Sequence, residues 1–137
     1  MPLDPKTLRY AATHEWVHVG RGPAGEKIAT VGLSDFALAA LTDLIHVELP
    51  PPGGQVSAGG PFGEVESVKA VSDLYSPVTG EIVEVNRPAV ENPEALAQDP
   101  YGAGWLVKIR IADESGLAGL LDYAAYQQQC QQESAES

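Results

Sequence analysis

The sequence predicts an all-β sandwich or barrel to which a few helices are appended. Up to about residue 111, the chain consists of short segments rich in β-branched residues, separated by Gly and Pro stretches. Apolar residues recur at helical spacing mainly near the C-terminus. Many short strands at close spacing are typical of a β-sandwich or barrel.

The first half of the chain begins with a predicted hairpin. Residues 15–19 (EWVHV) and 27–31 (KIATV) are strand-like, and GRGPAG joins them. Ser34 is a residue type that caps helix N-termini, so a short helix is expected over DFALAALT, residues 35–42. A further strand is expected over residues 44–49 (LIHVEL), and the PPPGG corner ends it.

The second half of the chain continues with strands and closes with helix. The expected strands are 62–68, 71–75, 81–86 and 105–111. Asn92, followed by Pro and Glu, favours a short helix before Pro100.

The whole chain, residues 1–137, is predicted to form one domain, because its length suits a single core. The β-sandwich is expected to occupy residues 1–111, followed by a helical segment at 112–130 that packs on it. The closing residues 131–137 are expected to form a frayed tail.

Composition narrows the possible functions. The net charge of -11 repels phosphate backbones, which disfavours nucleic-acid binding and favours partners with basic surfaces. No apolar run is long enough to cross a membrane, and the first residues do not resemble a signal peptide, so a cytoplasmic protein is expected. The single cysteine, Cys130, is interpreted as a tail residue near the end of a helix. No metal-binding motif is present.

The stretch ESVKAVSD, residues 66–73, departs from ordinary turn chemistry. Both of its flanks are strand-like, yet the expected two-residue turn consists of Lys69 and Ala70, with no Gly, Asn or Pro. Such a turn would display the lysine in solvent at its tip. The nearest charges in the sequence are acidic and nothing near this lysine would activate it as a nucleophile, so it suits modification by another enzyme better than nucleophilic catalysis.

Several blocks of the sequence resemble the H-protein of the glycine cleavage system, a lipoyl carrier. The resemblance is seen in THEWV, VGLSDFA, IHVELP, GEVESVKAVSDLYSPVTGEIVEVN and NPEALAQDPYGAGWLVKI, which together span most of residues 13–109. It implies two antiparallel sheets packed as a barrel-sandwich hybrid, with short helices and a C-terminal helical segment. It also implies that Lys69 carries lipoate through an amide bond.

The resemblance further implies a role as a carrier and not as an enzyme. The arm would take the aminomethyl group of glycine from a pyridoxal-phosphate-dependent glycine decarboxylase to a tetrahydrofolate-dependent aminomethyltransferase. An FAD-containing dihydrolipoamide dehydrogenase would then reoxidise the dithiol. A lipoylating enzyme is a further implied partner, and the protein itself is expected to be a monomer.

The resemblance places further residues around the arm. Glu15, Thr13 and Asp73 would form the site where the arm docks. Glu64 and Glu66 should share one face of a strand and help a partner or the lipoylating enzyme recognise the hairpin. No second His or Cys lies at metal-ligand spacing from His14, so this residue is interpreted as a packed histidine.

Other readings stay open from the residues. The same fold could serve as a lipoyl relay or donor protein, or as a biotinyl or lipoyl domain of another multienzyme system. Biotinyl domains usually flank their lysine with methionines, whereas Val68 and Ala70 stand here. An enzyme in its own right is disfavoured because no nucleotide-binding or nucleophile motif is present. An unmodified structural module is the third alternative.

Overall fold

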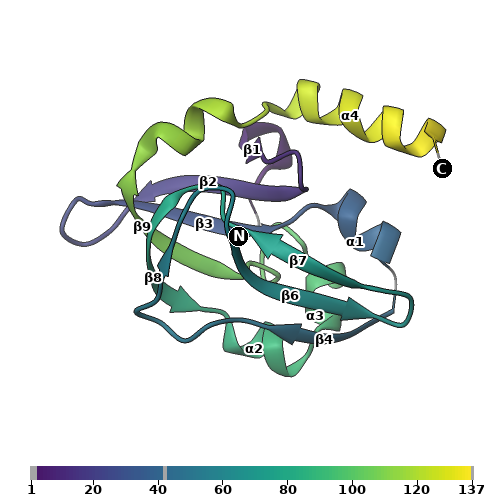
Figure 1. Cartoon of the computed structure of the whole chain (residues 1–137), viewed down its shortest axis with the longest axis horizontal. Helices are drawn as coiled ribbons and strands as arrows, with labels where there is room; N and C mark the ends of the chain where they lie inside the picture. The colour runs from purple at the N-terminus through teal and green to yellow at the C-terminus, as the bar shows by residue number, and fades with distance from the viewer. Residues whose placement is uncertain (1–2, 42, 137) are drawn as a thin grey trace.

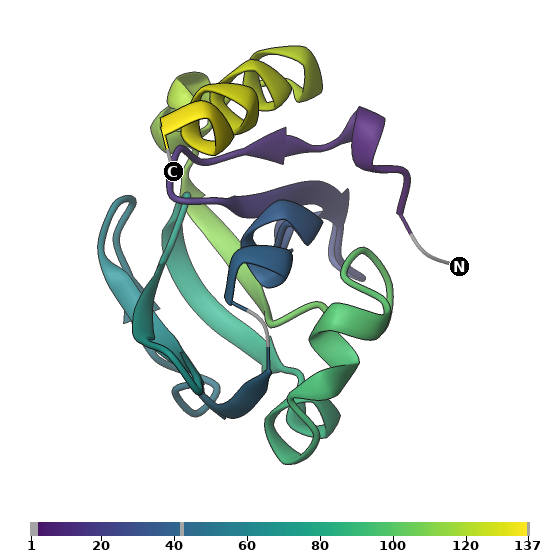
Figure 2. The same cartoon turned by 90° about the vertical axis from the view of Figure 1, so that its right-hand side faces the viewer.

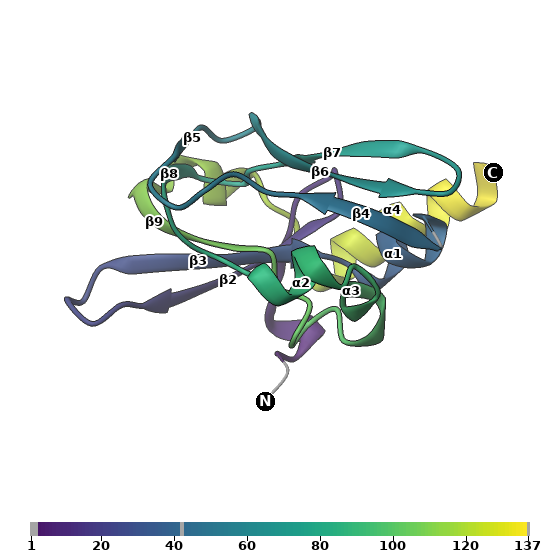
Figure 3. The same cartoon turned by 90° about the horizontal axis from the view of Figure 1, so that it is seen from below.

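Two antiparallel sheets form the body of the computed structural model, which describes residues 3–41 and 43–136 (Figure 1). The larger sheet has the strand order β1-β2-β3-β9-β8-β5, and the smaller has the order β4-β6-β7. Seen from below, the smaller sheet lies over β2 and β3 (Figure 3). This arrangement confirms the predicted fold class. The strands are β1 (Arg9–Tyr10), β2 (Glu15–Arg21), β3 (Lys27–Leu33), β4 (Leu44–Glu48), β5 (Gln55–Val56), β6 (Pro61–Ser67), β7 (Val71–Tyr75), β8 (Thr79–Val85) and β9 (Val107–Asp113).

Short helices connect the strands, and a longer helix ends the chain. They are α1 (Asp35–Leu41), α2 (Arg87–Glu91), α3 (Glu94–Gln98) and α4 (Tyr123–Glu136), with 3₁₀ turns at Pro5–Thr7 and Glu114–Gly119. As predicted, the Ser34 hydroxyl accepts a hydrogen bond from the Ala37 N–H (3.2 Å) and caps α1. No helix in the described part of the chain combines the length and apolarity that a membrane crossing needs.

The C-terminal segment differs from its prediction. The sequence indicated a helical segment to residue 130 and a frayed tail over 131–137, but α4 continues to Glu136. Gln129 explains part of this extension of α4, because its side chain donates hydrogen bonds to the carbonyl of Ala12 (2.8 Å) and to the carboxylate of Glu133 (2.7 Å). These contacts to the sandwich and along the helix are invisible to local sequence patterns. Ser137 lies outside the described residues.

The predicted hairpin of β2 and β3 is formed, in register from Glu15 opposite Leu33 to Arg21 opposite Lys27. Gly25 closes its turn with a φ of 84°, a conformation that favours glycine. Gly32 lies opposite Trp16, and a Cβ atom there would lie 2.5 Å from the indole ring. The absence of a side chain at residue 32 therefore lets Trp16 lie flat across β3.

The main core fills the space between the two sheets. Both sheets contribute buried β-branched and aliphatic residues to it, as alternation along the strands predicts. Central members are Val17, Val31, Val107 and Ile109 from the larger sheet and Val47, Val65 and Leu74 from the smaller. The β6–β7 hairpin is thus anchored through one face while its other face is directed outward.

A second, smaller core lies between α4 and the first strands (Figure 2). The rings of Tyr10 and Tyr126 stack there with their centroids 4.3 Å apart. Cys130 is buried in this cluster and only 5% exposed, so its interpretation as a tail residue was wrong. It behaves as a small apolar side chain that fastens α4 to the sandwich.

Candidate functional site

The β6–β7 hairpin presents Lys69 at its tip. Glu66 lies opposite Val71, and the Ser67 N–H donates to the carbonyl of Ala70 (2.8 Å). The two central residues of the turn are therefore Val68 and Lys69, and not Lys69 and Ala70 as the sequence suggested. Lys69 is exposed, as predicted, and none of the ion pairs found among the described residues involves it.

Side-chain and backbone acceptors satisfy this turn without a glycine. The buried hydroxyl of Ser67 accepts from the N–H groups of Lys69 and Ala70, at 3.2 Å each. The N–H of Val68 donates to the carbonyl of Asp43 (3.3 Å), just before β4. The local sequence signal for this arrangement is the serine two residues before the lysine, because serine hydroxyls commonly bond to nearby backbone groups.

A cavity of about 220 Å³ lies between the hairpin and α1. Its walls are mainly apolar, and Leu33, Phe36, Leu41, Val65 and Leu74 contribute to them. Its polar lining residues are Thr13, His14, Ser72, Asp73 and Glu133. Ser72 follows Lys69 by three residues along the chain, a separation of at most about 10 Å at the usual rise of a strand. A long side-chain arm attached at the tip can therefore fold back into this cavity.

Thr13 and Asp73, two of the predicted docking residues, meet at this cavity, whereas Glu15 lies beside it. The Glu15 side chain is fully buried, and its carboxylate accepts from the N–H of Tyr75 (3.0 Å) and from the hydroxyl of Thr13. Burial raises the pKa of Glu15, although both hydrogen bonds oppose the shift. Glu15 thus joins β2 of the larger sheet to β7 of the smaller, and it reaches the cavity through Thr13.

The C-terminal helix supplies a part of the cavity that the sequence did not predict. The ring of His14 lies between the hydroxyl of Tyr126 (Nδ1, 2.7 Å) and the carboxylate of Glu133 (Nε2, 3.0 Å). Its backbone has a φ of 83°, unusual for a residue other than glycine. Tyr126 also bonds to the buried hydroxyl of Ser34 (2.5 Å). His14 is therefore packed, as predicted, but as a link between α4 and the cavity.

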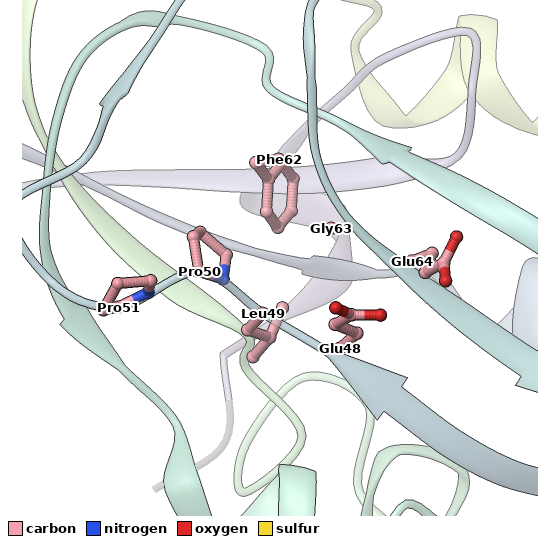
Figure 4. A pocket seen from close by; sticks show the side chains of 7 residues that line it. All are labelled: Glu48, Leu49, Pro50, Pro51, Phe62, Gly63 and Glu64. Carbon is pink, nitrogen blue, oxygen red and sulfur yellow. The ribbon is translucent and has the colours of Figure 1, made fainter.

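The expected recognition residues lie on the outer face of the smaller sheet. Glu64 and Glu66 alternate along β6 with buried Val65 and Ser67, so they share one face, as the sequence predicts. Glu64 lies opposite Glu48. These two carboxylates line an open hollow of about 480 Å³ with Leu49, Pro50, Pro51, Phe62 and Gly63 (Figure 4). This hollow is larger than the cavity beside α1, but Lys69 does not line it.

Metal chemistry finds no support in the side-chain arrangement. Within residues 3–41 and 43–136, no group of three His, Cys, Asp or Glu side chains is placed to hold a metal ion. The chemical resources of the site are an exposed amine, a nearby apolar cavity and a few polar groups that line it. Together with the fold, they define a carrier-type β-sandwich, in which a hairpin displays a lysine.

Comparison with known proteins identifies the family. The profile of the glycine cleavage H-protein family matches residues 8–133, and the chain belongs to this family. A glycine cleavage system H protein of Rhodopirellula baltica is 48% identical over 130 residues, which cover 95% of this chain and 97% of the relative. One from Rubrobacter xylanophilus is 51% identical over 120 residues, 88% of this chain and 91% of the relative.

A solved structure agrees with these relatives. The crystal structure of a glycine cleavage system H protein from Mycobacterium marinum superposes with a TM-score of 0.83 at 44% identity, covering 92% of this chain and 98% of that one. The family resemblance found in the sequence is thereby confirmed. Membership makes the chain a carrier protein of the glycine cleavage system and not a catalyst.

Proposed function

We propose that Lys69 is the attachment site of the lipoyl group in this carrier. Two of the four lysines are committed to ion pairs, Lys27 with Glu114 and Lys108 with Glu84. Lys69, by contrast, is exposed at the tip of an anchored hairpin. The observation that carries the proposal is this display, because an enzyme that acylates a lysine needs the amine to enter its own active site.

The residues present fit a lipoyl group. Amide formation removes the lysine charge and leaves a slim apolar arm, which reaches about 12 to 14 Å from the Cα atom at standard bond lengths. The cavity beside α1 is within this reach and mainly apolar. At about 30 Å³ per water-sized group, its 220 Å³ holds roughly seven such groups, enough for the ring and part of the chain of the arm.

The lipoyl group supplies the disulfide and thiol chemistry that takes up the aminomethyl group of glycine. The residues of this chain present and shelter the arm. Leu33, Phe36 and Leu74 exclude water from the cavity, which protects a group that water would otherwise release as ammonia. Asp73 and Thr13, with Glu15 behind them, supply acceptors for an ammonium group in the cavity.

The partners follow from the same proposal. The arm visits a pyridoxal-phosphate-dependent glycine decarboxylase, a tetrahydrofolate-dependent aminomethyltransferase and an FAD-containing dihydrolipoamide dehydrogenase, after a lipoylating enzyme has loaded it. The net charge of -11 favours basic docking surfaces on these enzymes. Glu64 and Glu66 share the outer face of β6, which supports a role for them in recognition by these enzymes. The expected cytoplasmic location and monomeric state stay predictions.

Intact-mass analysis of the protein from its own cells, together with Lys69→Ala, tests this function. We expect the mass increment of one lipoyl group on the wild type and on Lys6→Ala, a matched change of another exposed lysine, and none on Lys69→Ala. Lys69→Ala should fold normally and abolish glycine–bicarbonate exchange with the decarboxylase. Substantial exchange by this variant, or a biotinyl increment on the wild type, would refute the proposal.

A further inference from the structure

We propose that Ser67 is a positioning residue, whose hydroxyl holds the tip of the hairpin in the geometry in which the lipoylating enzyme accepts Lys69. This inference rests on the proposed function, because it assumes that Lys69 is acylated. It assigns to a buried serine a role in presenting the lysine. The hydrogen bonds of the turn carry the inference.

The backbone conformation of the tip is unusual for a tight hairpin. The favoured two-residue turn has positive φ at both central residues, which is why Asn-Gly is common there. Among the described residues other than glycine, only His14 and Asp43 have positive φ. Val68 and Lys69 therefore have negative φ, and turns of that kind do not match the twist of the flanking strands. Something other than intrinsic turn preference must hold this tip.

The Ser67 hydroxyl takes the place of a backbone acceptor. The N–H of Ser67 donates to the carbonyl of Ala70 (2.8 Å), but the N–H of Ala70 donates to the Ser67 side chain and not back to its carbonyl. The same oxygen accepts from the N–H of Lys69 and lies 3.3 Å from the Ala70 carbonyl, to which it donates. One hydroxyl therefore makes three contacts with the two residues at and after the tip.

The neighbouring strand completes the arrangement. The N–H of Val68 donates to the carbonyl of Asp43, whose own backbone has a φ of 36°. Every backbone N–H from Ser67 to Ala70 thus has an acceptor inside the protein. Ser67 itself is only 4% exposed, so its side chain has little freedom to rotate away. The direction in which the Lys69 side chain leaves the backbone is fixed before any partner binds.

Loss of the hydroxyl should affect presentation more than stability. The N–H groups of Lys69 and Ala70 lie at exposed residues, so water can replace the lost acceptor. The tip would then sample several conformations, and the enzyme would have to order it on binding. We expect kcat/KM for lipoylation to fall about tenfold, mostly through a higher KM, since binding must now select one conformation.

The test measures lipoylation of the full apo chain by a purified lipoate ligase with lipoate and ATP. Ser67→Ala is compared with the wild type and with Ser76→Ala. Ser76 is a matched control because it is also buried and its hydroxyl also bonds to turn backbone, at Val78, but at the other end of β7. Amide hydrogen exchange at Lys69 and Ala70 is followed in parallel, as is acylation of Lys69 by a small activated ester.

We expect faster amide exchange and the tenfold loss in Ser67→Ala alone, with unchanged reactivity toward the small ester. Ser67→Cys keeps a similar volume but offers only a weak acceptor, so its kcat/KM for lipoylation should also fall below that of the wild type. Wild-type kcat/KM in both Ser67 variants would overturn the inference, as would an equal loss in Ser76→Ala. A wild-type chain that the ligase does not modify would instead overturn the proposed function.

Discussion

Filling the cavity beside α1 should expose the loaded arm without disturbing Lys69. Ala40 lines the cavity and is exposed, so its replacement removes no core contact. Ala40→Leu adds three carbon groups, which occupy roughly 90 Å³ at about 30 Å³ each. Of the 220 Å³ available, about 130 Å³ would remain, too little for the seven groups of the arm that the cavity can hold.

The free energy at stake can be estimated from the arm itself. The seven groups that fit are the five ring atoms and two chain groups, so about four methylene groups are buried, which contributes about 3.2 kcal/mol at about 0.8 kcal/mol per group. Ordering a long flexible side chain costs about 1.8 kcal/mol. The difference, about 1.4 kcal/mol, corresponds to a factor of ten in the docked fraction. We therefore expect ammonia release from the carrier loaded with glycine's aminomethyl group to be about tenfold faster in Ala40→Leu.

The assay follows ammonia after charging with glycine decarboxylase and removal of that enzyme. Ala39→Leu is the matched control, because Ala39 is exposed on the same helix but does not line the cavity. Both variants should keep wild-type lipoylation and unfold within about 0.5 kcal/mol of the wild type, since Ala and Leu are both good helix formers. Equal release rates in the two variants would refute the assignment of this cavity to the arm.

Three further predictions concern polar groups around the cavity. Burial raises the pKa of Glu15, so its contribution to stability is present below its ordinary pKa of 4.5 and is lost as pH rises through the folded-state pKa. Urea unfolding should therefore show Glu15→Gln gaining stability relative to wild type between pH 4 and pH 7, and a pH-independent difference would contradict this. Tyr126→Phe should lower the free energy of unfolding, measured by thermal unfolding, by about 1 to 3 kcal/mol, because Ser34 and His14 each lose a hydrogen-bond partner. A decrease below about 0.5 kcal/mol would argue against this hydrogen-bond network. Asp73→Asn should speed ammonia release from the loaded carrier, and an unchanged rate would remove Asp73 from the docking site.

The parts of the fold that depend on local patterns were predictable from the sequence. The alternation of buried and outward residues predicted the strands, and the Gly/Pro stretch before Lys27 predicted the β2–β3 hairpin. The α1 helix followed from its serine cap. Each of these signals lies within a few residues of the element it predicts, and the physics behind it is equally local.

What the sequence missed depends on contacts between distant residues. His14 and Glu133 are 119 residues apart, so no pattern could show that α4 forms part of the cavity. Burial of Cys130 has the same origin, because the cluster that covers it comes from the first strands. The turn was placed one residue too late because standard turn preferences do not include a serine hydroxyl that replaces a backbone acceptor.

Buried side-chain acceptors fix both ends of the β6–β7 hairpin. Ser67 holds the tip, and Glu15 holds the N–H of Tyr75 at the other end of β7. Between them, β7 is an edge strand. The Ser67 N–H donates across the hairpin to the carbonyl of Ala70, and Asp73 lies three residues further along, opposite Glu64. Backbone groups alternate in direction along an antiparallel ladder, so the N–H and C=O groups of Asp73 point away from β6.

The free edge of β7 therefore runs beside the cavity that Asp73 lines. Unpaired groups on an edge strand are available to bind a further chain or ligand. An arm that folds back from Lys69 would meet main-chain donors and acceptors there as well as the Asp73 carboxylate. The same hairpin thus displays the lysine and forms one wall of the cavity in which we propose that the arm docks. A change at Glu15 should accordingly alter docking of the proposed arm through β7, while lipoylation at the tip, where we propose that Ser67 positions Lys69, should keep the wild-type rate.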